Sequence, residues 1–494
     1  MDTSSPKMYL TAMLKILTVS PTAVSVAVRP STRHRANIPC STEAREKLIK
    51  KFKSALFLTD ARIDRQGLIH TKGDRVRGTC EWIRADAVYQ DWLEGDSPMV
   101  WISGGPGRGK TMLSIFLTAE LETNPPPNAQ LMYYFCTAAD ENRSSATCVL
   151  RSLLYQLLAL YPHHAAHFLE HFRTAEELQK SVNYREALWS CLSDCLQDSS
   201  LAVTYCVLDG LDECDAESRQ WLVTRFERLM RSFRARNGTA SFRLVIVSRD
   251  ISGLQRCPRI KLDPDHDRDV GIDIEAVVTA RLDELMIDSF DVDAYDNVKQ
   301  ILIERSEGTF LWVGLVMVEL SNKSTYVEVL ATLSDLPKGL TAIYDRMLLR
   351  IEEKYQKSAA LLLLWVALAQ KPFDHQELAD AIDARPTAYL DAQDVVRYII
   401  TLCGSFVQSD DNGRIRFVHH TAREYLLQAR AVGHEVLAEL WRDREKAEER
   451  IVWRCLDVMA GGSSPFSSTH GKVALRSASH SAWMERPLIT SCAI

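Results

Sequence analysis

A glycine-rich segment at residues 104–111 has the residue types and spacing of a phosphate-binding loop. It fits the pattern G-x-x-x-x-G-K-[S/T] and lies between a predicted strand and a predicted helix. Glycines let backbone N–H groups surround a phosphate, and the N-terminus of the following helix adds its dipole. The Lys110 ammonium would reach the β- and γ-phosphates of a nucleotide, and the Thr111 hydroxyl would bind Mg²⁺. The predicted phosphate-binding residues are Gly104, Gly105, Pro106, Gly107, Arg108, Gly109, Lys110 and Thr111.

An acidic cluster, Asp209-Gly210-Leu211-Asp212-Glu213, follows the apolar run at 203–208. A carboxylate at the tip of a strand beside the phosphate loop can hold Mg²⁺ through its water shell, so Asp209 is the second predicted metal-binding residue. Asp212 and Glu213 are then candidates to orient or deprotonate the attacking water. Acids after a strand can also be solvated caps, so this interpretation depends on the phosphate-binding loop.

A second apolar run, at 244–247, ends in Ser248-Arg249. An arginine at the end of a neighbouring strand can sense the γ-phosphate of a nucleotide. Arg249 therefore joins Asp212 and Glu213 as a candidate catalytic residue, and an exposed surface arginine is the alternative.

Alternating strands and helices are expected to position these residues. This alternation is typical of a parallel sheet with helical crossovers, which predicts an α/β P-loop core. No further strand is expected until about Phe406. The predicted strands are 99–103, 131–136, 203–208 and 244–247, and the predicted helices are 110–122 and 146–161.

The segment before the first strand is predicted to be partly helical. Residues 42–56 are rich in Lys, Glu and Ala and indicate an exposed amphipathic helix. A polar stretch at 59–78 follows, in which Gly67, Gly73 and Gly78 are expected to act as breakers. A short helix is expected around residues 80–84.

Residues 256–430 are predicted to be mostly helical. Asp374 to Glu377 and Thr421 to Glu424 both have capping-box spacing, which predicts that a helix starts at each. Between them, 405–408 and 415–418 indicate a hairpin around the turn Asp411-Asn412-Gly413. This order of helices and hairpin is typical of a winged helix. The apolar run 359–369 is about half the roughly 20 residues that a membrane span needs, so a buried helix is expected.

Composition argues against several classes of protein. The chain has 494 residues, 46% hydrophobic and 25% charged, with a net charge of −6, which is unlike a chain that wraps nucleic acid. Its 12 cysteines include no C-x-x-C pair, which favours reduced thiols in the cytoplasm. No repeat with a period of about 20–50 residues is detected.

Taken together, these motifs resemble the NACHT branch of the STAND signalling NTPases, especially fungal incompatibility-type and nephrocystin-like proteins. The resemblance spans about residues 57–428, roughly three quarters of the chain. It is carried by the phosphate loop and by the segments 79–83, 209–214, 248–249, 310–313, 336–340, 344–347, 417–421 and 424–426.

The resemblance implies a molecular switch that binds ATP or ADP with Mg²⁺. ADP would hold the core, the helical domain and the winged helix closed, and exchange for ATP would open them and permit self-association. It also implies that His419 contacts the phosphates, with His420 as a spare neighbour. Relatives often carry a proline near the adenine, where this chain has Phe310. They also usually continue into repeats, so the chain is expected to be either a repeat-less variant or a truncated gene model.

These observations divide the chain into six predicted segments and suggest its partners. We expect a nucleotide ligand, self-association with ATP bound, an unidentified protein partner, and neither nucleic acid nor membrane. The segments are a disordered leader (1–40), a helical lead-in (41–95), a NACHT P-loop core (96–255), a helical domain (256–340), a winged-helix-like domain (341–430) and a weakly patterned tail (431–494).

Three functions remain open from the sequence. The first is a regulated nucleotide switch with slow hydrolysis, and the second is a scaffold that binds nucleotide without hydrolysing it. The third, a P-loop enzyme such as a kinase or helicase, is disfavoured because no substrate pocket or basic surface is evident. Turnover separates the first two, and Asp209, Asp212, Glu213 and Arg249 favour hydrolysis.

Overall fold

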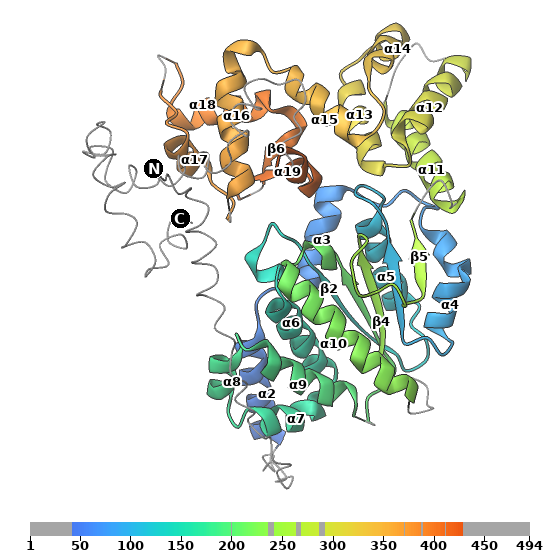
Figure 1. The fold of residues 1–494 in the computed structure, drawn as a ribbon, viewed down its shortest axis with the longest axis vertical. Helices are drawn as coiled ribbons and strands as arrows, with labels where there is room; N and C mark the ends of the chain where they lie inside the picture. Colours follow the sequence, from blue (N-terminus) through green and yellow to red (C-terminus); the bar gives the residue numbers. More distant parts are fainter. Residues whose placement is uncertain are drawn as a thin grey trace, which may run out of the picture.

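The computed structural model describes residues 42–198, 200–235, 242–262, 268–285, 292–369, 371–386, 389–410 and 412–427 (Figure 1). The predicted leader at 1–40 and the predicted tail at 431–494 lie outside the described residues, as does Asp411 of the predicted turn.

Five parallel strands form the central sheet, in the order β2-β3-β4-β1-β5. Every residue of β1, β3 and β4 is buried, as expected for a parallel sheet that is covered on both faces. The predicted α/β class is confirmed, and the four predicted strands form with small shifts at their ends. The strands are β1 (Met99–Ser103), β2 (Gln130–Phe135), β3 (Thr204–Asp209), β4 (Phe242–Ser248) and β5 (Arg259–Lys261).

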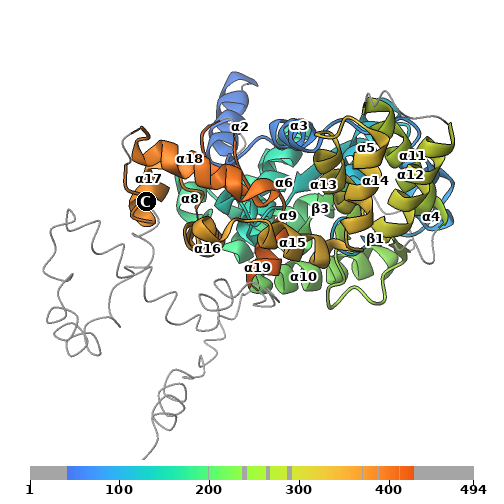
Figure 2. The same cartoon turned by 90° about the horizontal axis from the view of Figure 1, so that it is seen from above.

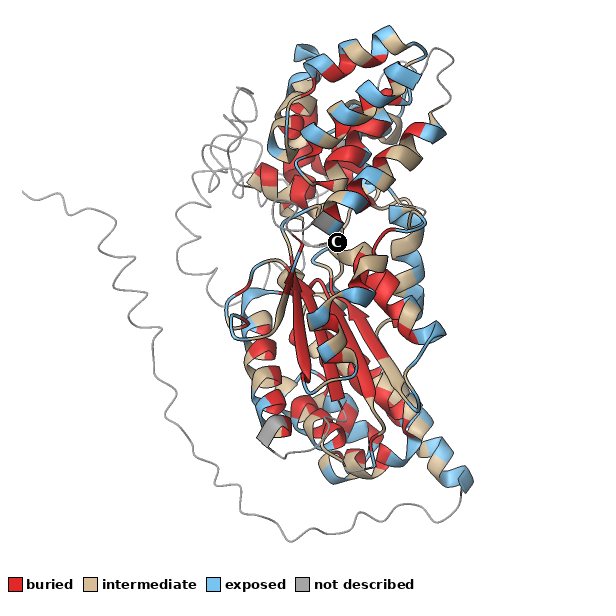
Figure 3. Cartoon of the chain, turned by 90° about the vertical axis from the view of Figure 1, so that its right-hand side faces the viewer, coloured by how far each residue is buried: buried red, intermediate tan, exposed pale blue. Residues whose placement is uncertain are grey.

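Side chains of each strand alternate between two hydrophobic clusters, one on each face of the sheet. Val100 and Ile102 of β1 pack with the cluster that contains α5, whereas Met99 and Trp101 pack with the opposite one. Figures 1 and 2 show helices on both faces, and Figure 3 shows the strands as a buried layer between partly exposed helices. The helices of the core are α4 (Ala87–Leu93), α5 (Lys110–Thr123), α6 (Ala146–Leu160), α7 (Ala165–His171), α8 (Ala175–Ser181), α9 (Arg185–Leu196) and α10 (Ala216–Ala235).

Two features of the sheet differ from the expectation. β5 was not predicted, because only Ile260 of its three residues is apolar and buried; it pairs with β1 and extends the sheet past the predicted boundary at 255. In addition, β3 does not lie next to β1, since β4 separates them. Asp209 nevertheless reaches the phosphate loop, because the carboxyl ends of parallel strands meet at one edge of the sheet.

The lead-in contains two long helices where one was predicted. The predicted helix is α2 (Thr42–Leu56), and the polar stretch after it forms α3 (Ala61–Lys72). Asp60 is the N-cap of α3 and accepts a hydrogen bond from the Arg62 N–H at 2.9 Å. Gly73 ends the helix at φ +82°, as a breaker would, but Gly67 lies within it. The short helix expected near 80–84 is the 3₁₀ turn η1 (Glu81–Ala85).

Two groups of helices follow the sheet and lie above the edge at which its strands end (Figure 1). A small antiparallel hairpin, β6 (Val407–Ser409) with β7 (Ile415–Phe417), belongs to the second group, as predicted for a winged helix. The first group contains α11 (Arg268–Glu284), α12 (Val292–Ser306), α13 (Phe310–Leu320) and α14 (Tyr326–Asp335). The second contains α15 (Leu340–Leu349), α16 (Glu353–Leu368), α17 (His375–Ala381), α18 (Ala392–Leu402) and α19 (His420–Leu427).

One of the two predicted capping boxes forms. Asp374 and Glu377 exchange both hydrogen bonds at the start of α17. The box predicted at Thr421 is wrong, because α19 begins one residue earlier and the Thr421 hydroxyl instead bonds Tyr344 and His419. The apolar part of α16 is buried, as predicted. Across the ranges described, no helix is both long and apolar enough to cross a membrane.

Candidate nucleotide site

The phosphate loop joins β1 to α5 and curls tightly because of two glycines. Gly107 and Gly109 have φ values of +72° and +78°, in the left-handed region that favours glycine. A Cβ on Gly107 would lie 2.6 Å from Cγ2 of Thr309, and one on Gly109 would lie 3.1 Å from the Phe310 ring. The loop is therefore packed against the start of α13, where larger residues would not fit.

The two cationic side chains of the loop turn in different directions. The Lys110 ammonium donates to the carbonyls of Gly104 and Gly105 at 2.8 and 2.7 Å, so it lies over the loop. Burial lowers the pKa of Lys110, and the nearby carboxylates of Asp212 and Asp209 oppose that shift. Arg108 instead donates to the carbonyl of Glu307 at 2.5 Å. The Lys110 side chain therefore folds back over the phosphate loop, whereas Arg108 ties the loop to the helical domain.

Asp209 and Thr111 provide oxygen atoms of the kind that Mg²⁺ binds. The Asp209 side chain, at the end of β3, is buried, and its Oδ1 accepts a hydrogen bond from Ser114 at 2.8 Å. Burial raises the pKa of Asp209, and hydrogen bonds from Ser114 and Thr111 lower it again. One carboxylate and one hydroxyl leave the other positions of an octahedral ion to phosphate and water, so these residues fit Mg²⁺ that is shared with a nucleotide.

Arg249 connects the core to the winged helix. Its backbone N–H donates to Asp212 Oδ1 at 3.1 Å, and its Nε lies 3.1 Å from Asp212 Oδ2. Its Nη1 donates to Glu424 Oε2 in α19 at 2.8 Å. Asp212 thus orients the Arg249 side chain in this structure, and Glu424 occupies the far side of the guanidinium.

Glu213 is held at the same interface. Its Oε2 accepts a hydrogen bond from the Ala138 N–H at 3.2 Å, and its Oε1 lies 3.6 Å from Nδ1 of His420. Burial, together with the charge of Asp212, raises the pKa of Glu213 to about 7. A carboxyl group with such a pKa suits proton transfer near neutral pH.

The two neighbouring histidines make different contacts. His419 Nδ1 accepts from the Thr421 N–H at 3.2 Å and lies 2.8 Å from the Thr421 hydroxyl, so the ring caps α19 and leaves Nε2 for any other partner. His420, expected to be a spare neighbour, faces Glu213 instead. Burial lowers the pKa of His419 to about 3 and that of His420 to about 2, so both rings are neutral at pH 7.

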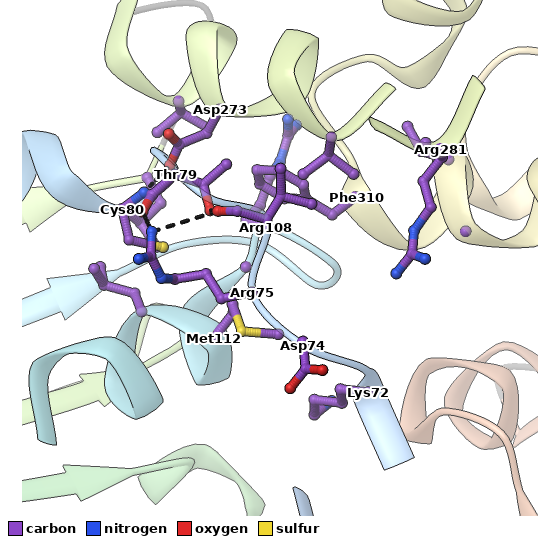
Figure 4. Close-up of a pocket in the computed structure, with 18 of the residues that line it drawn as sticks. Lys72, Asp74, Arg75, Thr79, Cys80, Arg108, Met112, Asp273, Arg281 and Phe310 are labelled. Carbon is purple, nitrogen blue, oxygen red and sulfur yellow. Dashed lines mark hydrogen bonds between the residues drawn. The ribbon is translucent and has the colours of Figure 1, made fainter. Parts of the chain in front are cut away.

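Two pockets meet at the phosphate loop. The first, here named the α11 pocket, has a volume of about 190 Å³ and is lined by Gly109, Met112, Phe310 and residues of η1 and α11 (Figure 4). The second, the α19 pocket, has a volume of about 320 Å³. It is lined by Thr111, Asp209, Asp212, Glu213, Arg249, His419, His420 and Glu424, among others. The folded chain therefore brings the predicted metal-binding and catalytic residues and His419 to one pocket.

The wall of the α11 pocket depends on a residue that sequence patterns did not indicate. Asp273 of α11 accepts hydrogen bonds from the Cys80 N–H at 2.8 Å and from Trp82 Nε1 at 3.0 Å. It thereby fixes Cys80 and the first turn of η1 against α11. No motif marked Asp273, whereas Glu424 lay in a segment noted for its resemblance and was expected only to take part in a capping box.

Two family models match this chain. Residues 78–249 match the nephrocystin 3 N-terminal family, and residues 344–435 match the winged helix domain of GPI inositol-deacylase. The vegetative incompatibility protein HET-E-1 of Podospora anserina is 28% identical over 425 residues, which cover 82% of this chain and 30% of that protein. The chain therefore spans less than a third of the length of this curated relative.

The solved structures to which this chain is similar are more distant. Cdc6p from Pyrobaculum aerophilum is 13% identical, with a TM-score of 0.34 over 79% of this chain and 98% of that one. The ADP form of the Aeropyrum pernix ORC2 protein is 13% identical, with a TM-score of 0.33 over 76% and 95% of the two chains. At this distance they carry no functional argument. The parallel sheet and the phosphate loop give this chain the fold of a P-loop NTPase, and the matches support a NACHT-type, nephrocystin-like core that is followed by a region similar to a winged helix domain.

Proposed function

We propose that this protein is an ATP/ADP-operated switch whose winged helix is released when the triphosphate binds. The observation that carries the proposal is the double contact across the α19 pocket, Arg249 with Glu424 and Glu213 with His420. Both core residues are those expected to act on the γ-phosphate or its attacking water. A γ-phosphate in this pocket would compete with Glu424 for the Arg249 guanidinium, which links nucleotide state to the position of α19.

The energetics of these contacts suit a reversible switch. The Arg249 and Glu424 side chains are 24% and 42% exposed, so their ion pair contributes about 1 kcal/mol or less. Lys371 and Glu141 form a further, longer ion pair across the same interface at 3.7 Å. Moving a two-state equilibrium from 1:99 to 99:1 needs about 5.5 kcal/mol. These pairs are too weak to hold the closed state alone, so bound ADP and interdomain packing supply the rest.

In this proposal the chain's own residues divide the work. The phosphate-loop amides and Lys110 would hold the phosphates, and Thr111 and Asp209 would hold Mg²⁺, which would neutralise phosphate charge. Asp212 orients Arg249, and Glu213 accepts a proton from water once His420 withdraws. Release of the winged helix would expose surfaces for self-association, and slow hydrolysis would restore the closed form.

The described cysteines are free thiols, which favours the cytoplasm as the compartment.

Nucleotide content and turnover of the purified protein test this function directly. ATP, ADP and GTP affinities are measured for the wild type and for Lys110→Ala. Losing a hydrogen bond to a charged partner costs about 1.5–3 kcal/mol, so ATP affinity should fall roughly 10- to 150-fold. Unchanged affinity in a folded Lys110→Ala variant would contradict the phosphate site. Nucleotide binding without turnover would instead favour the scaffold function.

A further inference from the structure

Lys72, the last residue of α3, stands where the two pockets meet. Among the described residues, it is the one side chain that lines both the α11 pocket and the α19 pocket. Figure 4 shows it at the end of the α3 ribbon, across the α11 pocket from Asp273 and Phe310. A ligand that passes from one pocket to the other along the phosphate loop would therefore pass Lys72.

The ammonium of Lys72 has no ion pair or hydrogen bond among the described residues, unlike the other cations of the two pockets. In the α19 pocket, Arg143, Arg249, Lys371, Arg416 and Arg423 each contact an acid or a backbone carbonyl. In the α11 pocket, Arg75, Arg108 and Arg281 do the same. Lys72 is thus the cation there that can bind an anion without first breaking a contact.

The field of Lys72 reaches the residues on the winged-helix side. Burial is the main cause of the lowered pKa of His419, and the positive charge of Lys72 is the next. The same charge acts against the rise in the pKa of Glu213. Asp74, two residues further on, lines only the α11 pocket. The lysine therefore adds positive potential on the side where Thr111 and Asp209 lie.

We propose that Lys72 is a second phosphate-binding lysine, which binds the nucleotide's outer phosphates from the end of α3 while Lys110 binds them from the phosphate loop. This inference rests on the proposed nucleotide binding. A lysine in the last turn of a helix also stabilises the helix dipole, so the test must separate the two roles. If Lys72 contacts phosphates, its loss should weaken binding most for the nucleotide that carries the most phosphates. If it only stabilises α3, its loss should weaken the binding of all nucleotides equally.

The experiment compares ATP, ADP and AMP binding to the wild type, Lys72→Met, Lys72→Arg and Lys180→Met. Lys180 is a matched control, because it is an exposed lysine in the last turn of another helix, α8, and lines neither pocket. Lys72→Met should weaken ATP about 10-fold, equivalent to about 1.4 kcal/mol, while AMP affinity stays within about 2-fold of the wild type. Lys72→Arg should restore most of the ATP affinity, and Lys180→Met should behave as the wild type.

Two results would overturn the inference, and they differ from failure of the proposed function. Unchanged ATP affinity in Lys72→Met, in a protein where Lys110→Ala does weaken ATP, removes Lys72 from the site but keeps nucleotide binding. Equal losses for ATP and AMP indicate a structural role in α3. Absence of binding by the wild type would overturn both proposals together.

Discussion

Arg249 and Glu424 are 175 residues apart in the chain, yet Nη1 of the arginine lies 2.8 Å from Oε2 of the glutamate. One residue follows the strand β4 of the NTPase core, and the other lies in the last described helix of the winged-helix domain. Because Asp212 holds the opposite side of the same guanidinium, the position of the winged helix and the geometry of the Asp212–Arg249 pair depend on each other.

Removing the charge of Glu424 should weaken the closed state. Glu424→Gln is expected to speed ADP release by roughly 2- to 5-fold, since a partly exposed ion pair contributes about 1 kcal/mol or less. Stopped-flow release of a fluorescent ADP analogue measures this rate. Glu353→Gln, an exposed glutamate at the start of α16, is the control. Equal ADP release rates in both variants would show that the pair does not hold the winged helix.

Both histidines should support the closed state, but through different contacts. His420→Ala removes the contact with Glu213 and should raise the open fraction, seen as a larger hydrodynamic radius. His419→Ala removes the cap of α19 and the ring nitrogen left for a ligand, so it should also speed ADP release. If His420→Ala matches the wild type in radius and in ADP release, the Glu213 contact has no part in closure.

Substitution of Glu213 should separate binding from hydrolysis. Glu213→Gln keeps the shape of the side chain and its acceptor for the Ala138 N–H, so nucleotide affinity is expected to change little. Turnover should fall by about 10²–10⁴-fold if this carboxylate is the general base. A phosphate-release assay at saturating ATP measures the change. An undiminished rate would assign the base elsewhere.

The same carboxyl group should make stability depend on pH. Its pKa rises from 4.5 to about 7 on folding, so between these values the folded protein holds a proton that the unfolded chain has lost. The contribution of this carboxyl group to the free energy of unfolding is therefore fully present below about pH 4.5. It is lost as pH rises through 7, and the total loss is roughly 3 kcal/mol. The lowered pKa values of His419 and His420 make stability change with pH in the opposite direction. Both histidines are present in the wild type and in Glu213→Gln, so this effect is common to the two proteins.

Thermal unfolding of wild type and Glu213→Gln from pH 5 to pH 8 tests this dependence. Because the glutamine variant cannot ionise, its melting temperature relative to the wild type should increase from pH 5 to about pH 7 and then level off. Glu353→Gln, at an exposed site, should follow the wild type at every pH. A constant difference between the Glu213→Gln and wild-type curves would contradict the raised pKa.

Local patterns were sufficient for the core of the fold and for the phosphate site. Strand β1, the phosphate loop and helix α5 follow one another in sequence, and each is encoded by short-range features: an apolar run, glycines at left-handed positions, and a helix that starts at Lys110. The capping box at Asp374 is equally local. Such features need few distant neighbours, so they can be predicted from spacing alone.

Tertiary packing decided the features that spacing could not indicate. β5 is a strand because the edge of β1 is available to pair with it, since its own residues are mostly charged. The insertion of β4 between β3 and β1, the pairing of Glu213 with His420 and the position of Lys72 between two pockets all join segments far apart in the chain. Sequence determined which residues could bind phosphate and Mg²⁺; only the folded arrangement determined which of them the winged helix contacts, because those contacts depend on how distant surfaces pack.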